Sequence, residues 1–228
     1  MSRNLFITGT GTDIGKTYVS GLIVKALHEA GLDAAYYKAA MSGNERRQDG
    51  SLIPGDALFV KNFSGISQSL ETMCPYVYEQ AVSPHLAARL EGRPVQMEVI
   101  KKTFQQVSRE HDYVIVEGSG GITCPIRYDG KPMWLTDIVR ELGLPSLMVA
   151  DAGLGTINGV MLTYAYMKQK NLPLKGILFN NFHAGDVMEE DNRRMCEEMT
   201  GLPVLACIPR GAQTLPGLGA EELAALFD

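Results

Sequence analysis

A glycine-rich segment near the amino terminus lies between a short apolar run and a helical pattern, and it constrains the fold more than any other feature. It reads Gly9-Thr-Gly-Thr-Asp-Ile-Gly15-Lys16-Thr17 and follows the apolar run 5–8. In such a loop, backbone N–H groups and the helix dipole bind phosphate, the lysine reaches the β- and γ-phosphates, and the threonine hydroxyl can bind Mg²⁺. Walker A spacing places glycine where this chain has Thr10, so the loop is a variant. The segment predicts a nucleoside triphosphate site.

Short apolar runs alternate with longer helical patterns along the rest of the chain. The runs are continuous, as in strands that are covered on both faces of a sheet, and occupy residues 5–8, 34–37, 113–116, 146–150, 176–179 and 204–208. Helical patterns occupy residues 19–30, a segment around 100–107, and segments near 134–143, 157–169, 187–199 and 219–227. This order predicts an α/β fold of the P-loop NTPase type, with a doubly wound, mainly parallel sheet flanked by helices.

Residues 39–95 are the least regular part of the sequence. They contain turn signals at Ser42-Gly-Asn, Gln48-Asp-Gly and Pro54-Gly55, a short helical pattern from Asp56, and a second helix start at Ser83-Pro84. We expect loops here that shape a pocket.

Composition and charge exclude several classes of partner. The chain has 228 residues, which we expect to form one domain over 1–228, and a net charge of −5 with a pI near 5.4. This charge argues against binding of nucleic acid or anionic lipid. No apolar run approaches the roughly 18 residues that span a bilayer, and no secretory signal is visible. The scattered cysteines lack metal-site spacing, so we expect reduced thiols in a cytoplasmic protein.

Polar residues follow each predicted strand. Ligands of open parallel sheets bind beyond the carboxyl ends of the strands, so these residues are expected to converge at one edge. They are Gly9 and its loop, Lys38, Glu117, Asp151, Asn180 and the pair Pro209-Arg210.

Two acidic residues are candidate Mg²⁺ ligands. Glu117 ends a buried run and precedes Gly118-Ser-Gly-Gly121, which would permit close backbone approach to a ligand, although the residue could instead leave the sheet into solvent. Asp56 is equally compatible with a second metal ligand and with the N-cap of its own helix.

Lys38 and the segment 151–158 each have two readings. Lys38 ends a Tyr-Tyr-Lys strand, where a second ammonium could neutralise transition-state charge or simply extend along the surface. The segment Asp151-Ala-Gly-Leu-Gly-Thr-Ile-Asn158 enters a helix through two glycines, which suits either a second anion site or an ordinary strand–helix turn.

Several motifs together resemble the dethiobiotin synthetase family. They are the loop 9–17, Tyr37-Lys38 with Ser42-Gly43, Ser-Pro-His-Leu-Ala-Ala at 83–88, Glu-Gly-Ser-Gly-Gly at 117–121, and Gly-Leu-Gly-Thr-Ile-Asn at 153–158. They span nearly the whole chain in the family's order. Two departures are Ala39, where the family usually has proline, and Gly11, where some members have an acidic residue.

The resemblance implies an ATP-dependent carboxylase that closes a cyclic urea in biotin synthesis. Its substrates would be 7,8-diaminononanoate, CO₂ and MgATP, and its products dethiobiotin, ADP and phosphate. An amine and CO₂ would form a carbamate that attacks the γ-phosphate, and the second amine would then attack the resulting carbamic–phosphoric anhydride.

The resemblance also implies roles for individual residues of this sequence. Lys38 would be the catalytic cation, assisted by Lys16, and Thr17, Asp56 and Glu117 would bind Mg²⁺. Thr12 and Ser42 would contact the carbamate or the diamine. Residues expected to bind the nucleotide are Asp13, Ile14, Gly15, Lys16, Thr17, Tyr18, Asp56, Glu117, Gly118, Gly120, Asn180, Asn181, Pro209, Arg210 and Gly211.

The family's active site lies at a homodimer interface. The resemblance therefore implies that Leu154, Gly155 and Asn158 of one subunit receive the far carboxylate of a substrate bound mainly to the other. One helix N-terminus would then bind the triphosphate and another the carboxylate.

Three other readings remain. A cobyrinate-type amidating synthetase would normally carry a glutaminase extension that this chain has no room for. A partition-type ATPase switch would carry an additional lysine early in the glycine loop, which is absent from Gly9-Thr-Gly-Thr-Asp-Ile14, and often a basic tail, whereas residues 220–228 are acidic. A simple nucleotide-binding regulator would leave Lys38 and the turn at 153–158 unexplained.

Overall fold

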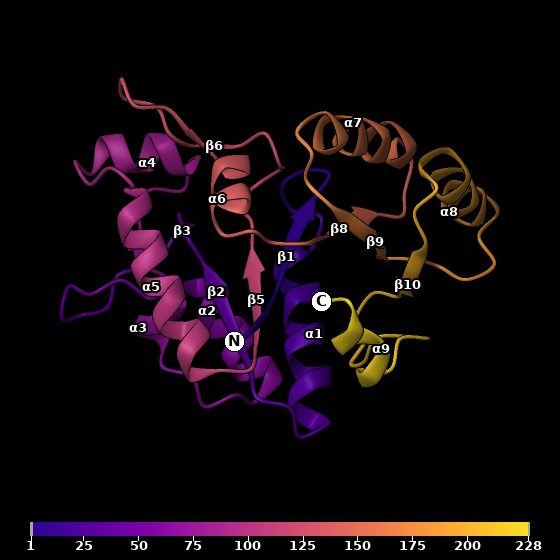
Figure 1. The fold of residues 1–228 in the computed structure, drawn as a ribbon, viewed down its shortest axis with the longest axis horizontal. Helices are drawn as coiled ribbons and strands as arrows, with labels where there is room; N and C mark the ends of the chain where they lie inside the picture. Colours follow the sequence, from indigo (N-terminus) through magenta and orange to yellow (C-terminus); the bar gives the residue numbers. More distant parts are fainter. Residues whose placement is uncertain (1, 228) are drawn as a thin grey trace.

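The computed structural model describes residues 2–227 and contains a six-stranded sheet at its centre (Figure 1). Every neighbouring pair of these strands is parallel, which confirms the predicted doubly wound fold and brings all carboxyl ends to one edge. In spatial order the strands are β10 (Val204–Ile208), β9 (Leu174–Asn180), β8 (Ser146–Asp151), β1 (Arg3–Gly9), β5 (Tyr113–Glu117) and β2 (Ala34–Lys38).

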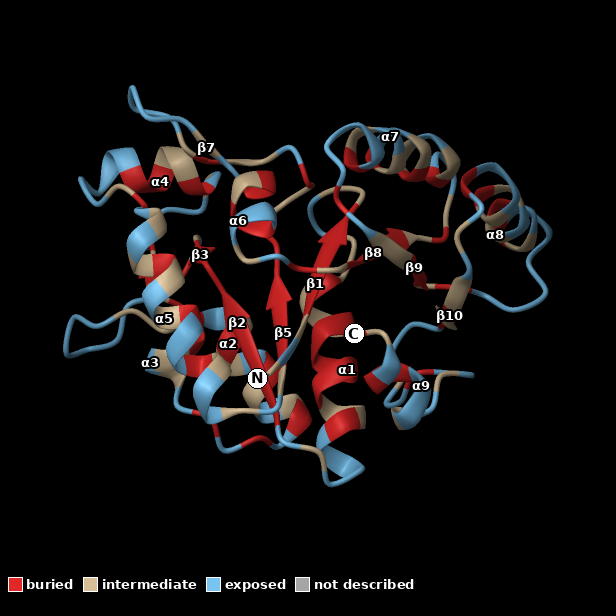
Figure 2. Cartoon of the chain, in the orientation of Figure 1, coloured by how far each residue is buried: buried red, intermediate tan, exposed pale blue. Residues whose placement is uncertain are grey.

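Both faces of the sheet are covered, which explains the continuous apolar runs. Leu5 and Ile7 of β1 pack into a cluster with α1 (Lys16–Glu29), whereas Phe6 between them belongs to a cluster on the opposite face. The strands are buried between helices that each expose one side (Figure 2). Burying a Leu or Ile side chain contributes about 1.5–3 kcal/mol, so these alternating contacts fix the strands within the sheet.

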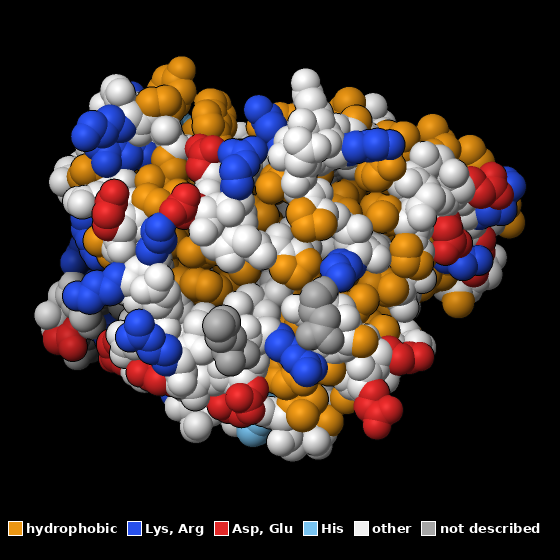
Figure 3. All heavy atoms as spheres, in the orientation of Figure 1, with side chains coloured by type: hydrophobic (Ala, Val, Ile, Leu, Met, Phe, Trp, Pro, Cys, Tyr) orange, Lys and Arg blue, Asp and Glu red, His pale blue; other side chains and the backbone are white. Residues whose placement is uncertain are grey.

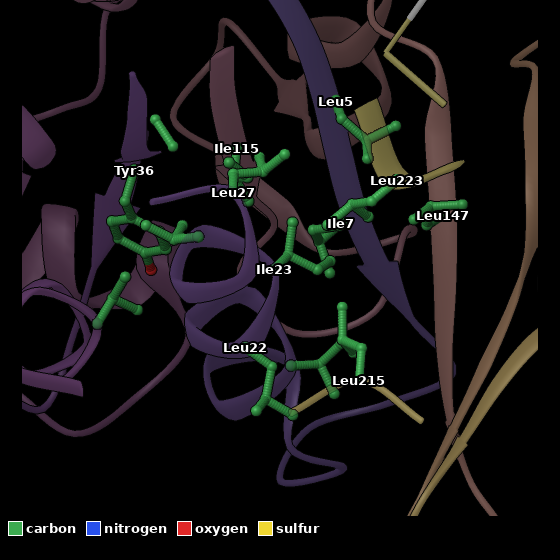
Figure 4. Packing of buried hydrophobic residues seen from close by; sticks show 14 of the residues in the cluster. Leu5, Ile7, Leu22, Ile23, Leu27, Tyr36, Ile115, Leu147, Leu215 and Leu223 are labelled. Atoms are coloured by element: carbon green, nitrogen blue, oxygen red, sulfur yellow. The ribbon is translucent and has the colours of Figure 1, made fainter. Parts of the chain in front are cut away.

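The face that carries α1 also receives α2 (Gly55–Ser64), α3 (Leu70–Met73) and α9 (Ala220–Ala225). Figure 4 shows Ile23 of α1 pointing toward Ile7 of β1, and Leu22 and Leu27 of α1 belong to the same cluster as Leu223 of α9. The carboxyl-terminal segment therefore completes the core around the helix that follows the glycine-rich loop.

The opposite face is covered by α5 (Met97–Glu110), α6 (Leu135–Glu141), α7 (Thr156–Gln169) and α8 (Val187–Thr200). The predicted face of α5 is confirmed, because Ile100, Phe104 and Val107 are its buried residues. Among residues 2–227, no helix combines the length and apolar character needed to cross a membrane.

The irregular stretch 39–95 contains short elements that pack beside the edge strand β2. Two-residue strands β3 (Ala40–Met41) and β4 (Tyr76–Val77) pair with each other, and α4 (Pro84–Leu90) begins at the predicted Ser83-Pro84 start. A further pair, β6 (Pro125–Arg127) and β7 (Met133–Trp134), is antiparallel and precedes α6. The N-cap alternative for Asp56 is wrong: α2 is capped at Pro54, and Asp56 lies inside the first helical turn.

Candidate active site

The central residues of the site lie at the carboxyl ends of three neighbouring strands. Because β5 lies between β1 and β2, Glu117 ends beside both the glycine-rich loop and Lys38, its register partner in β2. A cavity of about 680 Å³ opens over this edge. It is lined by Thr12, Asp13, Gly15, Lys16, Thr17, Tyr18, Lys38, Ala40, Met41, Ser42, Asp56, Phe59, Glu117, Ser119 and Gly120.

The glycine-rich loop has a conformation that depends on two of its glycines. A Cβ on Gly9 would lie 2.4 Å from Ile14 Cδ1, and Gly15 has φ of +89°, with its added Cβ 2.1 Å from Asn180 Nδ2. Thr10, at the position of the Walker A departure, donates its N–H to Val149 O at 3.1 Å and packs against Gly159 of α7. The departure is therefore accommodated by contacts outside the cavity, and the loop still leads directly into α1.

Lys16 turns back over its own loop. Its Nζ donates to Gly11 O at 2.7 Å, and the side chain is buried, with 7 % of the residue exposed. Burial lowers the pKa of the Lys16 ammonium, and the nearby Glu117 carboxylate only partly opposes this effect. The loop thus holds a cation whose charge is poorly compensated by the protein, which favours an incoming anion.

Lys38 lies between two carboxylates. Its Nζ is 2.6 Å from Asp56 Oδ2 and 2.6 Å from Glu117 Oε1. Burial by itself would lower the pKa of Lys38, but Glu117 and Asp56 outweigh it and raise the pKa above its usual value. Lys38 is 6 % exposed and Glu117 2 % exposed, so the surface-lysine and solvent-facing alternatives are wrong.

The oxygens around Lys38 also suit a divalent cation. Thr17 Oγ1 donates to Glu117 Oε1 at 2.9 Å, so one hydroxyl and two carboxylates converge on the place that the ammonium occupies. No group of three or more His, Cys, Asp or Glu residues forms a metal cage in the part of the chain that the structure describes. Mg²⁺ commonly uses one or two carboxylates together with phosphate oxygens and water, and Thr17, Asp56 and Glu117 fit that requirement.

Tyr36 is a member of the site that the sequence analysis missed. Its hydroxyl donates to Glu117 Oε2 at 2.8 Å from a fully buried position in β2. A usable signal exists, because residues two apart in a strand share a face and Lys38 is two residues after Tyr36. Phe59 lines the cavity one helical turn after Asp56, and Ser119 Oγ donates to Ala40 O at 2.6 Å.

Asn180 lies next to the loop and Asn181 next to Asp151, and neither is part of the cavity lining. Asn180 Nδ2 donates to Ile14 O at 3.0 Å, while its buried Oδ1 has no partner among the described residues. Asn181 Nδ2 donates to Asp151 Oδ1 at 2.8 Å, and Asp151 Oδ2 accepts from Gly153 N at 3.1 Å. Asp151 therefore stabilises the turn before α7.

Other predicted residues lie outside this cavity. Pro209, Arg210 and Gly211 are exposed, and the adjoining Ala212 accepts a hydrogen bond from the Tyr18 hydroxyl. Gly118 has a packing reason to be glycine, because an added Cβ would meet Phe6 Cζ at 2.8 Å and Leu135 Cδ2 at 2.9 Å. These positions do not line the cavity, and their nucleotide contacts stay predictions.

The residues expected to serve a second subunit are also outside the cavity of their own chain. Leu154 is 92 % exposed, and Gly155 and Asn158 are exposed beside it at the start of α7. Gly155 adopts φ of +90° as the residue before the helix, so the predicted glycine turn is present.

Comparisons with known proteins find a matching family model and similar sequences along nearly the whole chain. A family model described as an AAA domain matches residues 3–216. The ATP-dependent dethiobiotin synthetase BioD of Brachyspira hyodysenteriae is 48 % identical over 224 residues, covering 98 % of this chain and 99 % of that protein. The protein of the same name from Clostridium botulinum (strain Langeland) is 49 % identical over 207 residues, covering 91 % of each chain.

Solved structures show the same fold at low identity. A ParA family ATPase from Chlorobium tepidum has a TM-score of 0.59 and 12 % identity, covering all of this chain and 99 % of its own. The MinD cell division protein of Aquifex aeolicus has a TM-score of 0.56 and 12 % identity, covering 99 % of this chain and 95 % of its own. These likenesses confirm the P-loop NTPase fold alone.

Proposed function

The chain belongs to the ATP-dependent dethiobiotin synthetase family, and from this premise we propose that it converts 7,8-diaminononanoate, CO₂ and ATP into dethiobiotin, ADP and phosphate. The observation that carries the proposal is the meeting of Lys16, Lys38, Asp56 and Glu117 in one cavity beside the glycine-rich loop. A nucleotide-binding site alone needs the first lysine, whereas the second ammonium supplies a positive charge beside the reacting γ-phosphate.

The glycine-rich loop would hold the triphosphate. N–H groups of the backbone from Asp13 to Tyr18 and the ammonium of Lys16 would contact its oxygens, with the dipole of α1 adding partial positive charge. Asn180 would bind the base, since its unpaired Oδ1 can accept a hydrogen bond from the adenine amino group. Asn181 and the segment from Pro209 to Gly211 would complete the base side.

Thr17, Asp56 and Glu117 would hold Mg²⁺, which supplies charge neutralisation at the β- and γ-phosphates when bound. Lys38 would then direct its ammonium toward the carbamate and the γ-phosphate. Between the two carboxylates, the raised pKa of Lys38 keeps its ammonium protonated, so that the residue is a positive charge rather than a base.

The reaction would proceed in two substitutions. A carbamate oxygen attacks the γ-phosphorus and ADP leaves, which forms the carbamic–phosphoric anhydride. The second amine attacks the carbamoyl carbon, loses a proton, and expels phosphate as the ring closes. Thr12 and Ser42, which line the cavity near Lys38, would orient the carbamate or the diamine during both steps.

The remaining proposals concern organisation. We propose a single domain, a cytoplasmic location, and a homodimer in which Leu154, Gly155 and Asn158 of the partner subunit bind the substrate's far carboxylate. Their exposure at the start of α7, outside the cavity of their own chain, supports this role. Acidic and basic side chains both appear on the face in Figure 3, and the net charge of −5 argues against nucleic acid as a partner.

The decisive experiment measures phosphate release with each substrate omitted in turn. The proposal predicts release only when diamine, bicarbonate and MgATP are present together, with dethiobiotin formed in equal amount. ATP hydrolysis at the same rate without diamine would refute the proposal and favour a partition-type ATPase switch.

A further inference from the structure

Glu117 is held from two sides by different elements. Its Oε1 faces the cavity, where it meets Thr17 Oγ1 at 2.9 Å and Lys38 Nζ at 2.6 Å. Its Oε2 points away from these groups and accepts from the Tyr36 hydroxyl at 2.8 Å. The phenol therefore sets which carboxylate oxygen is free to face the cavity and at what angle.

Tyr36 is itself fixed through its backbone. It lies in the edge strand β2, where the Gln68 side chain takes the place of a further strand. Tyr36 N donates to Gln68 Oε1 at 2.8 Å, and Gln68 Nε2 donates to Tyr36 O at 3.1 Å. Gln68 is 6 % exposed, so this pairing is shielded from water.

The phenol of Tyr36 reaches Glu117 from inside the core. The residue is fully buried, so water does not compete for its hydrogen bond to the carboxylate. This donor takes Glu117 Oε2 and leaves Oε1 to Thr17 and Lys38.

We propose that Tyr36 is a positioning residue that orients Glu117 toward Mg²⁺ and Lys38, acting only through that carboxylate. The inference rests on the proposed function for its consequence in catalysis, but the geometry of Tyr36 and Glu117 is independent of the substrate. Outer-shell groups that orient metal ligands typically change metal affinity or activity by about 10–100-fold when removed.

The test compares Tyr36→Phe with Tyr37→Phe. Tyr37 is equally buried in the same strand but faces the other side of the sheet, where its hydroxyl meets Ile100 O at 3.1 Å and Thr103 Oγ1 at 2.8 Å. Each change removes one buried phenol hydroxyl, with one hydrogen bond for Tyr36 and two for Tyr37, so shifts in melting temperature of the same order are expected. Only Tyr36→Phe removes a contact to the site.

The readout is Mn²⁺ affinity, measured by electron paramagnetic resonance in the presence of a non-hydrolysable ATP analogue. We expect Tyr36→Phe to weaken Mn²⁺ binding by about 10-fold or more, and Tyr37→Phe to change it by less than about 2-fold. In the Glu117→Gln background, Tyr36→Phe is expected to have little further effect, because the group it orients has lost its charge. Equal Mn²⁺ affinity in the two phenylalanine variants would overturn the proposal.

Two further measurements keep the outcomes distinct. If Tyr36→Phe does not fold, the test passes to Tyr36→Met, which also lacks the hydroxyl but fills its space with a flexible apolar side chain, and unchanged Mn²⁺ affinity there overturns the proposal. Turnover is measured separately, and excess Mg²⁺ is expected to restore part of the activity of Tyr36→Phe. Wild-type protein that releases phosphate without diamine would refute the proposed function while leaving the Mn²⁺ result for Tyr36 intact.

Discussion

The two lysines of the cavity are placed by different means. Lys16 is positioned by its loop, bonds a backbone carbonyl and has a lowered pKa, chiefly because it is buried. Lys38 is positioned by the strands, lies between two carboxylates and has a raised pKa. The charge of Lys16 is therefore available to a bound anion, whereas the charge of Lys38 is already stabilised by two carboxylates of the protein. We therefore expect the first to contribute mainly to nucleotide affinity and the second mainly to turnover.

The largest expected effect is that of Lys38→Met on turnover. Removing a preorganised charge from a transition state typically costs about 10²–10³-fold in kcat. Affinity for a non-hydrolysable ATP analogue should change little, because Lys16 and the loop remain. Steady-state kinetics and calorimetric titration measure the two quantities, and a parallel loss of both would end the distinction between the lysines.

Lys16→Met should give the converse pattern. A hydrogen bond to a charged group contributes about 1.5–3 kcal/mol, so nucleotide affinity should fall by roughly 10–100-fold. The melting temperature without nucleotide should not fall, because the buried charge removed here has no carboxylate partner within bonding distance in the described contacts. Unchanged nucleotide affinity would contradict the assignment of Lys16 to the phosphates.

Asn158→Ala tests a residue outside the cavity that contains the two lysines. Asn158 is exposed at the start of α7, so ATP affinity should be unaffected. If the residue serves the partner's substrate site, the KM for the diamine should rise by about 5–10-fold, as for the loss of one polar contact. An effect on ATP alone would remove Asn158 from the substrate site.

The smallest expected effect is the pH dependence of stability, which should have opposite signs for the two lysines. The folded-state pKa of Lys16 is lowered, so the unfolded chain binds more protons as pH rises toward 10.5, and stability increases in that window. The folded-state pKa of Lys38 is raised, so its contribution is fully present below 10.5 and is lost as pH rises above that value. Denaturant unfolding from pH 8 upward gives the free energy of unfolding of wild type, Lys16→Met and Lys38→Met as a function of pH. The difference between wild type and each variant gives the contribution of that lysine. Contributions that change with pH in the same direction would contradict the two environments.

Much of the fold follows from local patterns. Each strand of the central sheet contains its predicted apolar run, and α1 begins directly after Gly15 as the loop requires. Strand patterns and a glycine turn depend on residues that are close in sequence. They can therefore be recognised without information on tertiary contacts. The same patterns placed Lys38 and Glu117 at strand ends, and parallel strands bring such ends to one edge.

The surroundings of these residues required the tertiary structure. Asp56 looked equally suited to a helix cap, and only the packing of α2 beside β2 brings its carboxylate to Lys38. Tyr36 carried no motif, yet its hydroxyl reaches a carboxylate 81 residues away because β2 and β5 are neighbours.

By itself, the sequence determined the six strands of the central sheet, the glycine-rich loop and the strand ends at which the charged residues lie, because each depends on neighbours along the chain. The order of the strands, and with it the partners of Lys38, Glu117 and Tyr36, was decided by tertiary structure. The reason is that crossover connections choose among distant strands through the packing of whole faces, which no single segment encodes.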